Sequence, residues 1–226
     1  MKQKIHNGFA IALAWPATNC KQAGAWYDAL LSLLAINKSG YYQVGHSAIV
    51  LVSDSSEKCH YFDFGRYHAP HGFGRIRSAL TDHDLKIKTL AKKTEDKTTI
   101  INVSSILKEI YANPSTHGDG PIYGSVTRIN FQSALDYAIS FQEKEFIPYG
   151  PFISKGTNCS RFVNKVMQKG WPKLVTRLLL KFPATISPTP MWNVKAAGRN
   201  IRKINNVKYK KEDMTLSNPE INILSA

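Results

Sequence analysis

One cysteine lies where the sequence indicates the start of a helix, which is a favourable place for thiol chemistry. Cys159 follows Asn158, a residue type that caps helices, and precedes apolar residues spaced for an amphipathic helix over residues 159–169. The free N–H groups and the positive end of a helix dipole stabilise a thiolate. Lys155 and Arg161 add positive charge nearby. We therefore interpret Cys159 as a candidate nucleophile.

A thiolate nucleophile needs a base that takes up and returns a proton, and histidine is the usual choice. Of seven histidines, only His46 and His60 fall on expected strands, where a rigid backbone can hold an imidazole in place. Either one could instead be a core residue with satisfied hydrogen bonds. Cys20 and Cys59 lack the electrostatic setting of Cys159 and are expected to be packing residues.

The two histidines belong to an expected β-hairpin. An apolar, β-branched run starts at His46, and a second run returns through Asp63 after a polar turn. The length of the turn places His46 roughly opposite Gly65, so that Asp63 is two positions from that point and His60 five. Asp63 is thus the nearer candidate for orienting His46, and an ion pair with Arg66 is its alternative role.

The remaining elements alternate between strands and helices, which indicates one mixed domain. We expect a catalytic domain over residues 1–197 and a basic, peripheral tail over residues 198–226. The expected elements are a strand at 9–14, a helix at 20–36, a loop at 65–74, a strand at 98–103, a helix capped by Ser104 or Ser105 that runs to Tyr111, a strand at 123–129, a helix capped by Asn130 that runs to Gln142, a basic helix at 172–181 and an extended segment at 183–190.

Composition excludes several classes of protein. The 226 residues are 43% hydrophobic, which is enough to bury a sizeable core and excludes a disordered chain. The sequence has no stretch of eighteen apolar residues, and three cysteines are too few for a disulfide scaffold. Lys2 and Lys4 before the apolar run at 8–15 could mimic a secretion signal, but Pro16 and the large-small alternation favour a strand. We expect a cytoplasmic protein, with a secreted or envelope-associated one as the alternative.

The net charge of +14 is concentrated in one segment. Residues 155–211 contain fourteen Lys or Arg and no Asp or Glu, whereas the rest of the chain carries sixteen of each sign. Such a field attracts anions, whether nucleic acids, acidic lipid head groups or acidic substrates. The alternative is a solvated surface that only confers solubility.

Three motifs in a fixed order resemble a known superfamily. GHSAIVLV at 45–52, YFDFG at 61–65 and TNCSRFV at 157–163 resemble the NlpC-type superfamily of papain-fold cysteine hydrolases. The histidine hairpin precedes the cysteine helix, an order similar to the circularly permuted branch that includes YiiX-like proteins and the lecithin-retinol acyltransferase group. The Asn-Cys-x-x-Phe-Val pattern within 157–163 is similar to the acyltransferases, and Pro-Tyr-Gly at 148–150 resembles the YiiX-like proteins.

This resemblance implies an α+β, permuted papain-like (NlpC-type) fold with an antiparallel sheet packed against the cysteine-bearing helix. It makes Cys159 the nucleophile and His46 the base, with Asp63 as the third residue on the YiiX-like pattern or His60 on the acyltransferase pattern. The backbone N–H of Cys159 would stabilise the oxyanion. Tyr149 and Asn158 are further candidates for oxyanion or substrate contacts. We expect no cofactor, and no metal either, because the candidate ligands, His68, His71 and residues 82–84, lie in loops without fixed ligand geometry.

The expected function is that of a thiol hydrolase that cleaves an amide or ester through a covalent acyl-enzyme. Its substrate would be a peptide, an isopeptide or an acyl ester, including an anionic one. One alternative is a lipid acyltransferase or thioesterase at an acidic membrane surface. Basic residues recur every four positions in both C-terminal helices, although neither helix is expected to offer a wide exposed apolar face. Another alternative is a nucleic-acid-binding protein without enzymatic activity, for which no motif is present.

Overall fold

The protein is built around a seven-stranded antiparallel sheet. The computed structural model describes residues 6–21, 37–38, 41–42, 45–150, 153, 155–183 and 187–205. The strand order is β10-β8-β1-β5-β6-β7-β9, and a small second sheet has the order β2-β4-β3. The strands are β1 (Gly8–Trp15), β2 (Cys20–Lys21), β3 (Asn37–Lys38), β4 (Tyr41–Tyr42), β5 (His46–Ser53), β6 (His60–Gly65), β7 (Phe73–Arg77), β8 (Ile122–Ile129), β9 (Ile147–Pro148) and β10 (Arg202–Ile204).

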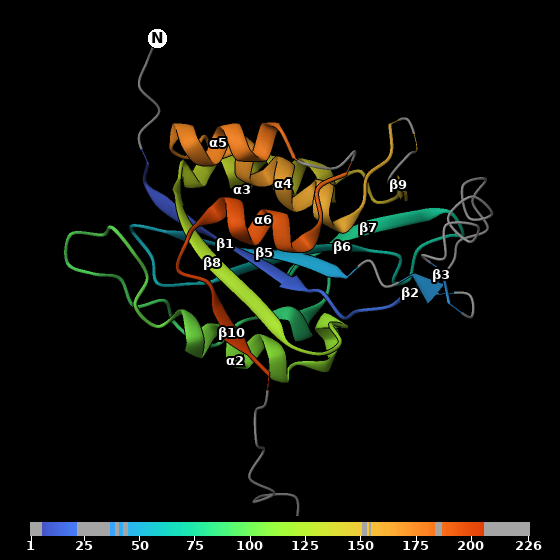
Figure 1. The fold of residues 1–226 in the computed structure, drawn as a ribbon, viewed down its shortest axis with the longest axis horizontal. Coiled ribbons are helices and arrows are strands. Elements are labelled where there is room, and N and C mark those ends of the chain that lie inside the picture. Colours follow the sequence, from blue (N-terminus) through green and yellow to red (C-terminus); the bar gives the residue numbers. More distant parts are fainter. Residues whose placement is uncertain are drawn as a thin grey trace, which may run out of the picture.

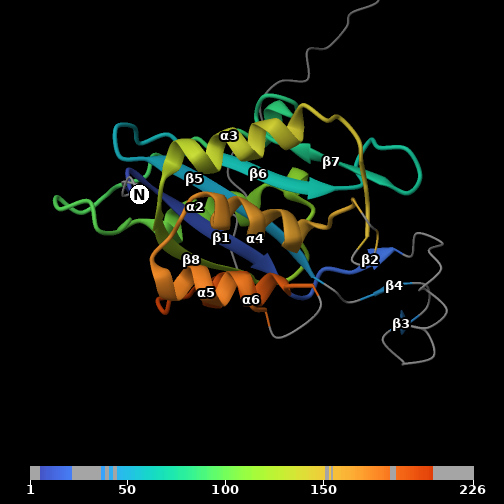
Figure 2. The same ribbon diagram turned by 90° about the horizontal axis from the view of Figure 1, so that it is seen from above.

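Helices cover both faces of the sheet. On one face lie α3 (Phe131–Gln142), α4 (Cys159–Lys169), α5 (Leu174–Lys181) and α6 (Pro190–Ala197), and on the other lies α2 (Val103–Ala112), as Figures 1 and 2 show. Short 3₁₀ turns occur at His83–Leu85 and Pro114–Thr116. The expected class is confirmed: an α+β fold whose antiparallel sheet packs against the helix that carries the cysteine. Within the described chain, no helix is long and apolar enough to span a bilayer.

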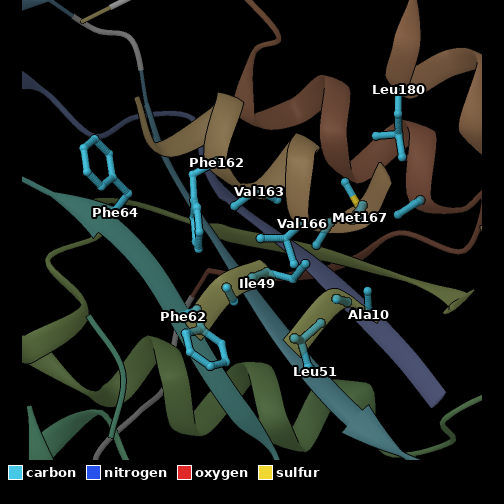
Figure 3. Packing of buried hydrophobic residues seen from close by; sticks show 14 of the residues in the cluster. Ala10, Ile49, Leu51, Phe62, Phe64, Phe162, Val163, Val166, Met167 and Leu180 are labelled. Carbon is cyan, nitrogen blue, oxygen red and sulfur yellow. The ribbon is translucent and has the colours of Figure 1, made fainter. Parts of the chain in front are cut away.

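The central strand β1 contributes to two hydrophobic cores. Because successive side chains of a strand point to opposite faces, its large residues at odd positions pack towards α2 and its alanines at even positions pack towards α4 and α6. Figure 3 shows Ala10 near Leu51 of β5 and beneath the apolar side of α4, which includes Val166 and Met167. The small alanines allow the helices to approach the sheet closely. The large-small alternation of residues 8–15 is therefore explained by a buried strand.

The structure confirms the strands at β1, β5, β6 and β8 and the helices α3 and α4, with ends that differ by a few residues from expectation. The basic helix α5 begins at Leu174 rather than at residue 172. The expected helix at 20–36 falls outside the described residues, except for the two-residue strand β2. Residues 206–226 also fall outside them, while Arg202–Ile204 form β10, which pairs with β8 at the edge of the sheet.

Three expectations were wrong, each for a physical reason. Residues 98–103 form no strand and make one isolated bridge, between Ile100 and Lys93. The apolar side chains are buried for other reasons: Ile100 fixes a loop to the core, and Val103 is the first residue of α2. Helix α2 begins before Ser104, with Asn102 at its N-cap. The loop expected at 65–74 ends at residue 72, because β7 starts at Phe73. The two arginines of β7 can be partly or fully buried in the sheet because each is paired with a carboxylate.

Candidate thiol site

The thiol of Cys159 is held at the first residue of α4. The Asn158 side chain accepts a hydrogen bond from the Arg161 N–H at 2.8 Å, which is the expected N-cap. The Asn158 amide also donates to the Ser187 hydroxyl at 3.0 Å. Both ends of this side chain therefore fix the start of the helix, and the structure does not place Asn158 among the residues that line the cleft.

The hairpin brings His46 and Asp63 together as the register predicts. Ala48 pairs with Asp63, so that continuing the ladder by two residues sets His46 opposite Gly65. His46 and Asp63 are then diagonal neighbours on the same face of the hairpin. The His46 Nε2 and Asp63 Oδ2 atoms are 3.4 Å apart, and both side chains are buried. Gly45 lets the chain turn into β5, because its φ is +73° and a Cβ there would lie 2.9 Å from the Trp15 carbonyl oxygen.

The Asp63 carboxylate is anchored by an arginine that the sequence analysis did not identify. Arg77 lies directly opposite Asp63 in the β6–β7 ladder and donates from Nε at 2.9 Å and from Nη2 at 2.6 Å. The Tyr61 hydroxyl donates to the same carboxylate at 2.9 Å. The ion-pair partner that the structure gives Asp63 is Arg77, whereas the sequence analysis offered Arg66 as the alternative. The alternation of Gly, Arg, Ile and Arg at 74–77 was the signal for a strand that could have identified Arg77.

His60 is not brought to the site. It pairs with Leu51, five residues along β5 from His46, which corresponds to about 17 Å of strand. Its ring lies 5.8 Å from the ring of Phe131, centroid to centroid. Burial lowers its pKa. The second histidine of the acyltransferase pattern therefore has no counterpart here in His60.

The Cys159 thiol and the His46 imidazole line the same cleft and interact with each other. Burial on its own raises the pKa of Cys159, but the interaction with His46 and the Ser47 N–H outweigh burial and lower the pKa. Burial on its own lowers the pKa of His46, whereas the interactions with Asp63 and Cys159 raise it to about 9. Both shifts favour a thiolate–imidazolium pair. The largest favourable contributions come from His46 and Ser47 rather than from the expected Lys155 and Arg161.

A cleft of about 610 Å³ opens onto the thiol and the imidazole. The loop at residues 65–72 forms much of its wall, and Thr18 and Asn19 contribute to another part. Tyr149 lines the same cleft, and its ring stacks on Phe64 with 5.5 Å between the centroids. The site can therefore admit a substrate to a nucleophile that is itself mostly buried.

The carboxylate of Asp82, just before the 3₁₀ turn at His83–Leu85, is bound by an arginine of β7. Arg75 holds Asp82 with two hydrogen bonds, of 2.9 and 2.6 Å. Among the described residues, no three His, Cys, Asp or Glu side chains are grouped as a metal ion would require.

The sheet, the cysteine-bearing helix and the grouping of Cys159 with the His46–Asp63 pair define a protein of the papain-like α+β class with a candidate thiol site. The sequence profile described as "Type VI secretion system effector TseH-like" matches residues 10–174. The chain therefore belongs to the TseH-like family of type VI secretion system effectors.

One solved structure supports the fold. The crystal structure of the type VI secretion system effector TseH is similar with a TM-score of 0.54 and 17% sequence identity, over 85% of this chain and 88% of that chain. No curated protein matches the sequence. Membership of a secretion-effector family agrees with the secreted alternative rather than with the expected cytoplasmic location.

Proposed function

We propose that this effector is a thiol hydrolase of the NlpC type, with a circularly permuted order of its catalytic residues, that cleaves an amide or ester after secretion. The observation that carries the proposal is that Cys159 and His46 line the same cleft, with the imidazole hydrogen-bonded to the buried Asp63 carboxylate behind it. This arrangement has the parts of a nucleophile–base–acid triad.

In the proposed reaction, the Cys159 thiolate attacks the substrate carbonyl carbon and forms a C–S bond. The resulting oxyanion collapses, the bond to the leaving group breaks, and the leaving amine or alcohol takes the proton held by His46. Water then adds to the thioester and gives its proton to His46, and collapse of the second intermediate releases the acid and the thiolate. Asp63 keeps its negative charge throughout and orients His46 through Nε2.

The start of α4 supplies donors for the oxyanion in this proposal. The N–H groups of Arg161 and Phe162 are bonded to Asn158, whereas those of Cys159 and Ser160 have no acceptor within the helix. The dipole of α4 reinforces them. We assign the Cys159 N–H as the main oxyanion donor, and Tyr149 as a residue that contacts substrate from the cleft wall.

The placement of the candidate residues favours this function over the two alternatives. The acyltransferase pattern calls for a second histidine, and His60 lies at the other end of the hairpin. A nucleic-acid-binding function explains the basic segment but gives no reason for a buried carboxylate that is hydrogen-bonded to an imidazole beside a thiol.

Labelling with a thiol-reactive acyl probe tests the proposal. We expect one acyl group per chain, located on Cys159 by peptide mass spectrometry, and release of that group by water over time. Cys159→Ala should abolish labelling, and the matched variant Cys59→Ser should not. Labelling of the Cys159→Ala variant to the same extent, or a stable adduct that never hydrolyses, would contradict the proposed hydrolase.

A further inference from the structure

Helix α5 presents its apolar side chains to solvent. Val175 is 71% exposed, Leu174 59% and Leu178 48%, and Phe182 just beyond the helix is 65% exposed. Of the eight residues of α5, all of them described, Leu180 alone is buried. We call these exposed residues, together with the flanking Trp171 and Leu179, the α5 apolar face. The sequence expectation that neither basic helix offers such a face was wrong for α5.

The spacing of these residues places them on one side of the helix. Leu174 and Leu178 are four apart, and Phe182 follows after another four, so that they align along one stripe. Leu180, which packs into the core, lies on the opposite side. A surface helix normally shows only its polar side to water, whereas in α5 most of the apolar side is exposed as well. Figure 1 shows α5 at the outer edge of the helical layer, with α4 and α6 between it and the sheet.

Basic residues flank the α5 apolar face. Lys173, Arg177 and Lys181 recur every four residues and form a neighbouring stripe. The Arg177 guanidinium lies 5.0 Å from the Trp171 ring centroid, and the Lys181 ammonium lies 5.4 Å from that of Phe182. Cations thus border the apolar side chains at both ends of the helix. Apolar residues with an aromatic at the edge and lysine or arginine alongside are the pattern of helices that lie in a membrane interface.

We propose that the α5 apolar face docks on an anionic lipid surface. The charge of the chain argues for this occupant: residues 155–211, which include α5, carry fourteen basic residues and no acidic one, so the whole region is complementary to acidic head groups. Docking would bury the large exposed side chains in the interface while the lysines reach the head groups.

Docking in this position leaves the cleft open. Helix α4 is about 15 Å long from Cys159 to Lys169, α5 follows its far end, and no residue of the α5 apolar face is among those that line the cleft. The membrane contact is therefore independent of the chemistry at Cys159. A substrate held at or near a membrane would be concentrated near an effector that is bound there.

Sedimentation of the full chain with vesicles tests the docking. We expect binding to vesicles of phosphatidylcholine and phosphatidylglycerol mixed in equal amounts, weak binding to pure phosphatidylcholine, and loss of binding as salt is raised. The double variant Val175→Ser/Leu178→Ser should lose affinity by about tenfold or more. Its matched control is Leu80→Ser, which removes a side chain that is 77% exposed elsewhere on the surface and should bind as the parent does.

A charge variant distinguishes docking on acidic lipid from non-specific hydrophobic adsorption. Lys173→Gln/Lys181→Gln should weaken binding to the mixed vesicles by about tenfold or more, while Lys97→Gln/Lys108→Gln, an equal loss of charge on exposed residues elsewhere, should weaken it much less. The Cys159→Ala variant should bind unchanged. Equal binding to neutral vesicles, equal losses in both charge variants, or a dimer in light scattering that the Val175→Ser/Leu178→Ser variant abolishes would overturn the proposal.

Discussion

At the residue scale, the position of His46 depends on a carboxylate whose charge is balanced within the sheet. Asp63 is fully buried and receives hydrogen bonds from Tyr61 and Arg77 in addition to its contact with His46. Burial on its own raises the pKa of Asp63, but the His46 hydrogen bond and the Arg77 charge outweigh it and lower the pKa. The carboxylate therefore stays ionised, which holds His46 in one orientation and favours its protonated form.

The first prediction concerns Arg77. Replacing it in Arg77→Met leaves the Asp63 carboxylate buried without its ion-pair partner, and we expect the free energy of unfolding to fall by about 3–5 kcal/mol. Urea denaturation measures this change. Arg75→Met is the matched control, because Arg75 lies two residues away on β7 and pairs with the partly exposed Asp82. That control should cost on the order of 1 kcal/mol. Equal losses in the two variants would argue against a special role of Arg77.

The second prediction is a pH dependence of alkylation. Because the pKa of Cys159 is lowered, its thiolate persists to lower pH, and the rate of reaction with iodoacetamide should have its midpoint below about 8.5. Burial raises the pKa of Cys59 to about 12, so Cys59 should react far more slowly at neutral pH. Peptide mass spectrometry measures both rates in the same sample. In His46→Gln, the imidazolium is lost while burial remains, and the Cys159 midpoint should move upward.

The pH dependence of hydrolysis at alkaline pH reports on His46, the second member of the thiolate–imidazolium pair. The raised pKa of His46, about 9, means that the imidazolium is present below this pH and is lost above it. Hydrolysis of an acyl probe should therefore decline near pH 9, because the leaving group no longer receives a proton. A Cys159 alkylation midpoint at or above that of an ordinary thiol would contradict the ion pair and remove the main electrostatic support for the nucleophile.

At the element scale, the third prediction is that the N-cap of α4 positions the Cys159 thiol, whereas the N-cap of another helix contributes only to stability. Asn158→Ala removes the side-chain acceptor at the start of the helix and should cost about 1 kcal/mol of stability. It should also slow the alkylation of Cys159, because the first turn of α4 sets the position of the thiol. Asn130→Ala removes the equivalent cap of α3 and should cost a similar amount while leaving that rate unchanged. Equal effects of both variants on the Cys159 rate would refute the positioning role.

Local rules predicted the elements that carry Cys159, His46 and Asp63. The N-cap and apolar stripe placed α4, and the turn length fixed the register that sets Asp63 beside His46. These features depend on neighbours in the sequence. Arg77 was missed because the alternation at 74–77 indicates a strand but does not say that this strand pairs with β6 and sets Arg77 opposite Asp63. The exposed face of α5 was missed because periodicity identifies an apolar side but cannot say which way it points.

At the scale of the whole molecule, the candidate site joins the two layers of the fold, namely the hydrophobic core between the sheet and α2 and the core between the sheet and α3, α4, α5 and α6. His46 and Asp63 share the face of the hairpin that packs towards α2, since they alternate in phase with Val50 and Tyr61 of that core. Cys159 belongs to α4, whose buried side chains pack on the opposite face of the sheet. The thiol and the imidazole meet only while both layers are assembled on the same strands.

The last prediction is that the two layers unfold as one unit, because β1 and β5 contribute side chains to both cores. Met167→Ala in α4 and Ile106→Ala in α2 should each reduce stability by about 2–5 kcal/mol. Cys59 packs beside the α2 core, and its raised pKa keeps it slow to react until the chain unfolds. In Met167→Ala, the urea midpoint of Cys59 alkylation should shift by the same amount as the urea midpoint of the far-ultraviolet circular dichroism transition. If Met167→Ala shifts the dichroism transition but not the Cys59 transition, the layers unfold independently and the shared strands do not couple them.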